Sequence, residues 1–320
     1  MKSNVLIKLL ASGEVQSGSN LAAALGVSRT AVWKQIRRAI DRGYPIETVR
    51  GKGYRLVGHV DLLDRDDLLA GLPDPVLGRV SVQVLDSVDS TNAEVSRRFA
   101  AGETAILVSL ADAQTAGRGR RGRNWQSPQG ENLYLSLGLS LPGGFSALDG
   151  FSLVVGVAAV ETLSALGVQD LSLKWPNDIL HRGHKLGGIL IELQGELESV
   201  ARIVAGVGLN VHMTDAVGVG QDWTSLTLID PVTSWQRSRI GSALVSSIIS
   251  AFDEFAKCGF EVFRQRWQRW DAFEGKPLRT LQGDYQGVGR GIDASGNYLI
   301  ETTSGIQCVR AGEISFRVVS

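Results

Sequence analysis

The segment Gly117–Arg123 places four arginines and three glycines in seven residues. Guanidinium groups bind carboxylates and phosphates through charge-assisted hydrogen bonds, whereas glycines make the backbone costly to order. Apolar, β-rich runs flank the segment, so we expect a loop between two strands that becomes ordered on an anionic ligand. Two alternatives are a segment that tracks nucleic acid and a solvated loop without a function.

Two lysines lie on either side of a polar turn further along the chain. The stretch LSLKWPNDILHRGHKLGGILIEL predicts a strand, a turn, a hairpin and a second strand. Lys174 and Lys185 flank the turn that contains Asn177 and Asp178. Isolated lysines are normally solvated, but two lysines beside a rigid polar turn in a strand-rich region indicate a functional site.

The tetrapeptide DSTN lies between a predicted strand and a predicted helix. Ser90, Thr91 and Asn92 therefore belong to a turn at which hydroxyl groups and free backbone N–H groups face one spot. Such a turn can bind a ligand. The alternative is that Ser90 or Thr91 serves only as the N-cap of the helix.

The first sixty residues predict a helix-turn-helix followed by a basic β-hairpin. Gly26 is suited to end the first helix and Ser28 to cap the second, whose buried stripe would be Val32, Ile36 and Ile40. The stretch TVRGKGYRL then reads as strand, turn and strand, which is typical of a wing that contacts phosphates.

Charge supports a nucleic-acid-binding role for this unit. Residues 1–60 contain ten Lys/Arg and three Asp/Glu, whereas the other 260 residues contain 23 and 30. Phosphate contacts would give salt-dependent affinity first and base readout second. The alternative is an αα-hairpin with a solvated basic face. The candidate DNA-binding residues are Ser28, Arg29, Thr30, Lys34, Arg37 and Lys52.

Length and composition predict a multidomain α+β protein. No uninterrupted apolar segment is long enough to span a bilayer, so we expect no membrane association. Cys258 and Cys308 lack metal-ligand spacing, which predicts a reduced, cytoplasmic protein with buried thiols and no protein-bound metal. We expect a DNA-binding domain at residues 1–60, a linker with a short helix at 61–79, a catalytic domain at 80–272 and a small β domain at 273–320.

The motifs DSTN, QTAGRGRRGRNW, KWPND, HKLGGILIEL and GVGLNV, in this order, resemble those of the biotin protein ligase family. With the helix-turn-helix, essentially all 320 residues resemble the bifunctional biotin ligases that also repress the biotin operon. Lipoate ligases share the catalytic fold but lack the arginine-glycine loop and the DNA-binding domain. The resemblance implies a winged helix-turn-helix, a class II synthetase-like mixed β-sheet with helices, and a C-terminal SH3-like β-barrel.

The resemblance also implies a function. Family members make biotinyl-5′-adenylate from biotin, ATP and Mg²⁺, and then transfer the biotinyl group to a lysine of a biotin carboxyl carrier protein. The adenylate-bound form homodimerises on operator DNA. Two alternatives remain: a ligase whose N-terminal domain is not an active repressor, and a non-catalytic biotin-sensing repressor, which Lys185 and the intact loop argue against.

The matching positions imply roles for individual residues. Lys185 would lie where the carboxylate meets the α-phosphate, and Asp178 would help to deprotonate the acceptor lysine. With Arg120 these are the expected catalytic residues. The biotin-binding set is Ser90, Thr91, Asn92, Gln114, Arg118, Gly119, Arg120 and Lys185. The nucleotide-binding set is Arg118, Arg120, Arg123, Trp125, Lys174, Asn177 and Asn210. Asn124 departs from the pattern, because some relatives have a basic residue before the tryptophan.

Overall fold

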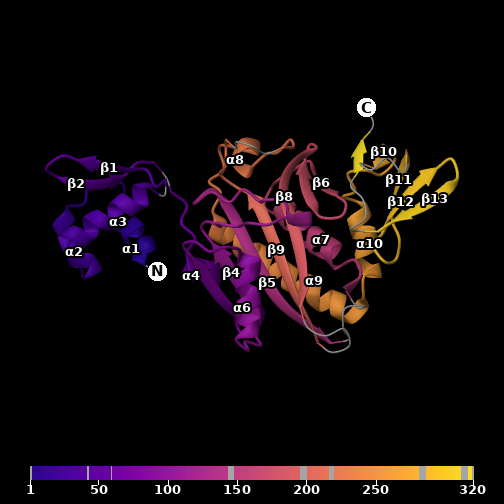
Figure 1. The fold of residues 1–320 in the computed structure, drawn as a ribbon, viewed down its shortest axis with the longest axis horizontal. Helices are drawn as coiled ribbons and strands as arrows, with labels where there is room; N and C mark the ends of the chain where they lie inside the picture. Colours follow the sequence, from indigo (N-terminus) through magenta and orange to yellow (C-terminus); the bar gives the residue numbers. More distant parts are fainter. Residues whose placement is uncertain are drawn as a thin grey trace.

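The computed structural model describes residues 2–41, 43–58, 60–142, 148–194, 200–215, 220–280, 286–310 and 316–318. These residues form an N-terminal helical unit with a hairpin, a central sheet flanked by helices, and a C-terminal antiparallel sheet (Figure 1). The multidomain α+β architecture expected from the sequence is therefore present.

The N-terminal unit is a helix-turn-helix followed by a hairpin, as predicted. Gly26 ends the second helix with a φ of 61°, and the Ser28 hydroxyl accepts a hydrogen bond of 3.2 Å from the backbone N–H of Ala31. The expected buried stripe is wrong at one position, because Ala39 is buried and Ile40 is exposed. The elements are α1 (Lys2–Leu10), α2 (Gly18–Leu25), α3 (Arg29–Asp41), β1 (Ile46–Val49) and β2 (Gly53–Leu56).

Residues 61–79 form two short helices that pack against the central domain. These helices are α4 (Arg65–Ala70) and α5 (Asp74–Leu77), and the Asp64 side chain caps α4. Leu68 and Val76 belong to the same hydrophobic core as the central sheet. The segment is thus packed onto the central domain, while the exact domain boundaries stay a prediction.

The central sheet has seven strands in the order β3-β4-β5-β9-β8-β7-β6. Only β3 and β4 pair in parallel, so the sheet is mixed, as expected. The strands are β3 (Val80–Leu85), β4 (Ile106–Ala111), β5 (Asn132–Pro142), β6 (Leu171–Lys174), β7 (Asp178–His181), β8 (His184–Gln194) and β9 (Val200–Asn210).

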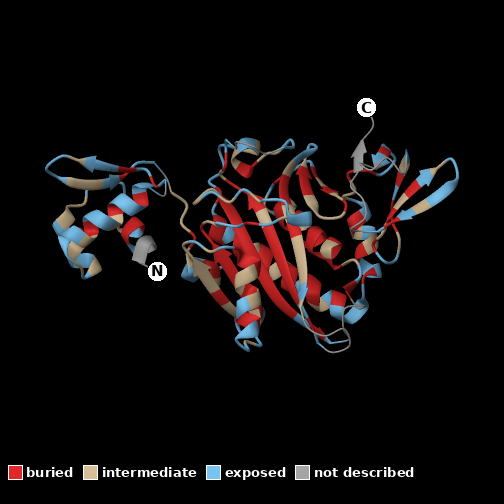
Figure 2. Ribbon diagram, in the orientation of Figure 1, coloured by how far each residue is buried: buried red, intermediate tan, exposed pale blue. Residues whose placement is uncertain are grey.

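Helices cover both faces of this sheet, and its strands β4, β5 and β9 are mostly buried (Figure 2). In β4, Val108 faces the large core with α7 and α9, whereas the adjacent Leu107 packs with Val95 and Phe99 of α6. This alternation follows from the two-residue period of a strand. The helices are α6 (Thr91–Ala100), α7 (Phe151–Ala165), α8 (Leu226–Ile229), α9 (Arg237–Cys258) and α10 (Glu261–Gln268).

The C-terminal region is an antiparallel sheet in the order β13-β12-β11-β10-β14. Its strands are β10 (Pro277–Thr280), β11 (Gln286–Ile292), β12 (Tyr298–Thr302), β13 (Gly305–Val309) and β14 (Phe316–Val318). Among the described strands β13 and β14 are the edges, and no pairing closes them into a barrel.

The two cysteines lie at the surface of the protein. Cys258 and Cys308 are both exposed, so the expected burial of the thiols is wrong. Both lie at surface positions, the last residue of α9 and the edge strand β13, where a small apolar side chain is not enclosed.

Within the described ranges, no helix combines the length and the apolar character needed to cross a bilayer.

Candidate active site

The arginine-glycine segment lies in the loop between β4 and β5, as predicted. The segment is folded back on itself, because the backbone N–H of Gly119 donates to the carbonyl of Arg123 at 2.7 Å and that of Trp125 donates to the carbonyl of Gly117 at 3.0 Å. A short 3₁₀ turn spans Arg120–Gly122. The guanidinium groups of this turn thus project from a compact loop, and its ordering by an anionic ligand stays a prediction.

Lys185 and Asp178 form an ion pair at one end of the sheet. Lys185 Nζ lies 2.8 Å from Asp178 Oδ1, and the two side chains are only 16% and 15% exposed. The hairpin of β7 and β8 places both residues. The backbone of Lys185 is held on its other side, since its N–H donates to Asp222 and its carbonyl accepts from Thr224. The ammonium group is therefore fixed in position.

Arg120 lies near this pair because it donates a hydrogen bond to Asn177, the residue before Asp178 in the KWPND turn. Its Nη1 donates to Asn177 Oδ1 at 3.3 Å, while Asn177 Nδ2 donates to the carbonyl of Ile189 on β8 at 2.8 Å. Burial lowers the pKa of the Arg120 guanidinium, and the neighbouring Arg121 adds to this, whereas Asp178 opposes it. A guanidinium stays protonated at neutral pH even so. The three predicted catalytic residues are thus brought together.

The DSTN turn forms a hydrogen-bonded cluster with Gln114 and two strands. Thr91 donates to Gln114 Oε1 from both its backbone N–H, at 2.8 Å, and its hydroxyl, at 3.1 Å. The hydroxyl of Ser136 on β5 lies 2.7 Å from Thr91 Oγ1 and 2.6 Å from Asn92 Oδ1. Asn92 Nδ2 donates to Glu192 Oε2 on β8 at 2.8 Å. The Asn92 amide is therefore engaged inside the protein.

Ser90 stands at the N-cap position of α6, but its side chain makes no cap hydrogen bond. The capping alternative does not account for this hydroxyl, which lies on a buried residue.

Glu192 also connects this cluster to the arginine-glycine loop. Its Oε1 lies 3.5 Å from an Nη of Arg118, while Oε2 accepts from Asn92. Sequence reasoning missed both Glu192 and Ser136. The available signal was a polar residue within a mostly apolar run of a strand, because such a residue needs a buried partner if the strand is central.

The Trp125 indole packs against the backbone of Gly188 and Gly208. A Cβ on Gly208 would come within 2.6 Å of the indole, and one on Gly188 within 3.3 Å. Lys185 Nζ is 5.4 Å from the centre of the indole. The buried indole Nε1 has no hydrogen-bond partner among the described residues. A side chain at position 208 would therefore displace the indole, whereas one at position 188 would require only a small shift.

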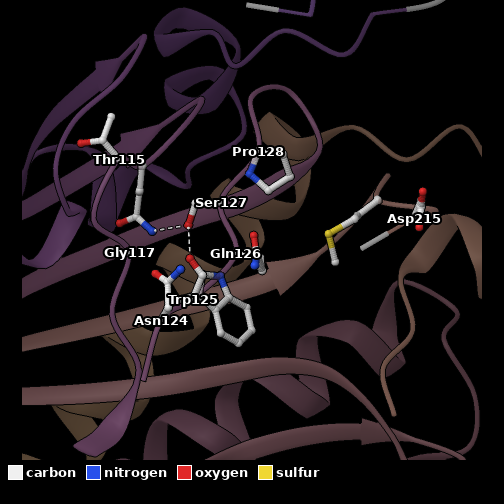
Figure 3. A pocket seen from close by; sticks show the side chains of 10 residues that line it. Thr115, Gly117, Asn124, Trp125, Gln126, Ser127, Pro128 and Asp215 are labelled. Carbon is white, nitrogen blue, oxygen red and sulfur yellow. Dashed lines mark hydrogen bonds between the residues drawn. The ribbon is translucent and has the colours of Figure 1, made fainter. Parts of the chain in front are cut away.

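A cavity of about 440 Å³ lies on the loop side of this indole (Figure 3). Its lining combines the loop with the segment after β9: Gln114, Thr115, Gly117, Asn124, Trp125, Gln126, Ser127, Pro128, Met213 and Asp215. Lys185 and Arg120 do not line it. Trp125 thus both lines the cavity and lies beside Lys185.

Two predicted nucleotide-binding residues have partners within the protein. Lys174 Nζ lies 5.9 Å from the ring centre of Phe273, at the junction with the C-terminal region. Asn210 is buried, and its Nδ2 donates to the carbonyl of Thr224 at 2.9 Å. Asn210 thus fixes the segment that runs beside Lys185. Arg123 is exposed on the loop.

The predicted DNA-binding residues lie outside this site. All of them are exposed on α3, at its N-terminus or in the β1–β2 turn: Ser28, Arg29, Thr30, Lys34, Arg37 and Lys52.

Comparison with known proteins agrees with both regions. Residues 84–210 match the biotin/lipoate A/B protein ligase family, and residues 2–55 match a helix-turn-helix domain family. The chain is 38% identical to the bifunctional ligase/repressor BirA of Escherichia coli, over 98% of this chain and 96% of that protein. It is 33% identical to BirA of Bacillus subtilis, over 95% and 94%. The structure of a biotin protein ligase from Aquifex aeolicus in complex with biotin and ATP superposes with a TM-score of 0.66, at 29% identity, over 75% of this chain and 99% of that one.

The fold, the motifs and these similarities define a protein ligase with an attached DNA-binding module. The chain belongs to the biotin/lipoate A/B protein ligase family, and within it to the bifunctional biotin ligase/repressors.

Proposed function

We propose that this chain activates biotin with MgATP and transfers the biotinyl group to a lysine of a biotin carboxyl carrier protein. A carboxylate oxygen of biotin attacks the α-phosphorus, and pyrophosphate leaves. The acceptor amine then attacks the acyl carbon and loses a proton, an amide bond forms, and AMP leaves with the electron pair of the broken C–O bond. The single observation that carries this function is the enclosed Lys185–Asp178 pair with Arg120 beside it.

Lys185 and the loop arginines supply positive charge to two anionic reactants. A carboxylate and a triphosphate repel each other, so a fixed ammonium between them lowers the barrier by stabilising charge on phosphorus. Arg118 and Arg120 would close over the carboxylate and phosphate and keep water from the mixed anhydride. Asp178 has a second carboxylate oxygen besides the one paired with Lys185, and this oxygen would accept the proton of the acceptor amine.

The cluster around Gln114 suits an uncharged ring. Ser90, Thr91 and Gln114 would bind the ureido group of biotin through neutral donors and acceptors. Asn92 would hold these residues in place through its hydrogen bonds with Glu192 and Ser136. On the nucleotide side, Trp125 would provide an aromatic face, Asn177 and Asn210 would position the backbone, and Lys174 and Arg123 would add charge. Mg²⁺ would enter with ATP as part of the substrate.

ATP–pyrophosphate exchange by the purified protein tests the proposal. Exchange that depends on biotin, and that Lys185→Ala abolishes, would support it. Exchange with lipoate instead would move the chain to the lipoate ligases, and no exchange with either acid would leave a ligand-sensing repressor.

The N-terminal unit favours a second role in repression. Its exposed basic helix and wing suit one operator half-site, so a homodimer would bind a two-fold symmetric operator. We propose that the adenylate-bound form dimerises through an edge of the central sheet, that the C-terminal sheet is part of an SH3-like barrel, and that the protein acts in the cytoplasm. Footprinting of a biotin-operon promoter with and without biotin and ATP tests repression, and protection without these ligands would contradict it.

A further inference from the structure

Tyr44 belongs to the DNA-binding unit but reaches into the central domain. Its ring is buried in the N-terminal hydrophobic core together with Ile36 and Leu56. Its hydroxyl donates to Asp112 Oδ2 at 2.8 Å and accepts a hydrogen bond of 3.1 Å from Gln129 Nε2. One hydroxyl therefore joins two domains.

The two partners of this hydroxyl lie at opposite ends of the ligand loop. Asp112 directly follows β4, and Gln129 lies three residues before β5. Gln129 Nε2 also donates to Asp112 Oδ2 at 3.2 Å, and the backbone N–H of Gly130 donates to the Asp112 carbonyl at 3.0 Å. The segment between them contains the arginine-glycine motif and Trp125. These contacts therefore close the base of the loop.

A buried arginine fixes Asp112 from the other side. Arg237, at the start of α9, is fully buried, and its Nη2 lies 2.7 Å from Asp112 Oδ1. The same guanidinium contacts Asp61, which follows the DNA-binding unit, with Nε 3.3 Å from Oδ2. His212 Nε2 lies 2.9 Å from that Asp61 oxygen. Burial opposes the charge of Asp61, but hydrogen bonds from His212 and Arg237 outweigh it and lower the pKa of this carboxyl.

The Tyr44 hydroxyl keeps the proton that it donates to Asp112. Burial, together with the nearby charge of Asp112, raises the pKa of the Tyr44 hydroxyl above its usual value. The hydroxyl thus stays protonated at any physiological pH, and it gives Asp112 a hydrogen bond from outside the catalytic domain.

We propose that Tyr44 is a positioning residue for the ligase reaction, through which docking of the DNA-binding unit holds the base of the 112–131 loop in its ligand-binding arrangement. This inference rests on the proposed function of that loop. By thermodynamic linkage, a ligand that orders the loop also stabilises the docked position of the DNA-binding unit, which gives each site a means to affect the other.

Tyr44→Phe tests the proposal, because it keeps the buried ring and removes only the hydroxyl. In the ligand-free full-length protein we expect faster amide hydrogen exchange across residues 112–131. We also expect the KM for biotin to rise about three- to tenfold, the effect of one lost hydrogen bond, with little change in kcat. Gln129→Ala should loosen the loop at least as much, because Gln129 donates to Asp112 as well as to Tyr44. The effect of the double variant should be smaller than the sum of the two single effects, since the three side chains form one network.

Tyr54→Phe is the matched control. Tyr54 lies on β2 of the same unit, and its hydroxyl makes no hydrogen bond with the described residues, so this change should alter neither readout. Unchanged loop exchange in Tyr44→Phe, or equal effects of both tyrosine variants, would overturn the proposal. The amide-exchange measurement needs no activity. Failure of the ligase function would appear separately, as wild-type protein without biotin-dependent ATP–pyrophosphate exchange.

Discussion

The ammonium of Lys185 and the carboxylate of Asp178 lie 2.8 Å apart, with both side chains largely removed from solvent. An ammonium held in this way does not need to reorganise when charge develops on a bound phosphate. In the proposed reaction the same pair would hold Asp178 near the acceptor amine. The first prediction concerns this pair.

We expect Lys185→Ala to lower the rate of biotin-dependent ATP–pyrophosphate exchange by about 10²–10³, which corresponds to the loss of one preorganised donor. Lys257→Ala, at an exposed position near the end of α9, is the control and should leave the rate unchanged. A Lys185→Ala rate within twofold of wild type would argue against the role of this lysine.

We expect Gly208→Ala to displace the Trp125 indole, because the new Cβ would lie 2.6 Å from it. A displacement of about 1 Å near the reacting groups can lower kcat/KM by as much as about 10²-fold. The control is Gly78→Ala, where no atom lies within 4 Å of an added Cβ. Equal activity of the two variants would show that the seat of the indole is unimportant.

We expect Glu192→Ala to lower the free energy of unfolding by about 1–3 kcal/mol, because the buried Asn92 amide loses its acceptor at 2.8 Å and keeps only the Leu190 carbonyl at 3.4 Å. Glu301→Ala removes a surface ion pair with Arg290 and should cost at most about 1 kcal/mol. Urea unfolding followed by circular dichroism would compare the two variants. A smaller loss for Glu192→Ala than for Glu301→Ala would contradict the prediction.

Stability near the C-terminal sheet should depend on the ionisation of Asp271. Burial raises the pKa of this carboxyl to about 6, although Phe273 and Tyr298 donate hydrogen bonds to it. The folded state therefore binds its proton more tightly than the unfolded state. The stabilisation is complete below the unfolded pKa near 4, and it is lost as the pH rises through 6.

Asp271→Asn should flatten this dependence, since asparagine does not titrate. The melting temperature measured between pH 4 and pH 8 would show it. Wild-type and variant curves that run parallel over this range would show that Asp271 does not titrate as described.

Lys52→Ala should reduce the slope of the logarithm of operator affinity against the logarithm of salt concentration by about one, because one phosphate contact is lost. Arg79→Ala, at an exposed ion pair in the central domain, should leave the slope unchanged. Titrations of labelled operator DNA at several salt concentrations would measure both slopes. An unchanged slope for Lys52→Ala would exclude a phosphate contact from the wing.

The sequence by itself determined the local elements and the family. Gly26 and Ser28 specify the turn between α2 and α3 through backbone conformation and capping, which act over a few residues. The hairpin that brings Asp178 to Lys185 is equally local, so the pair could be expected from the KWPND turn and the lysine after it. The order of the motifs was sufficient to identify the biotin ligase fold.

Only the tertiary structure decided how distant polar residues combine. Tyr44 and Asp112 are 68 residues apart, and Asp112 and Arg237 are 125 apart. A buried ion pair and a solvated charge have the same sequence signature, because burial depends on which strands become neighbours. Glu192 likewise lies in the mostly apolar run GGILIEL of β8, and the sequence does not show that Asn92 and Arg118 become its partners. The site and its connection to the DNA-binding unit therefore follow from packing across the sheet.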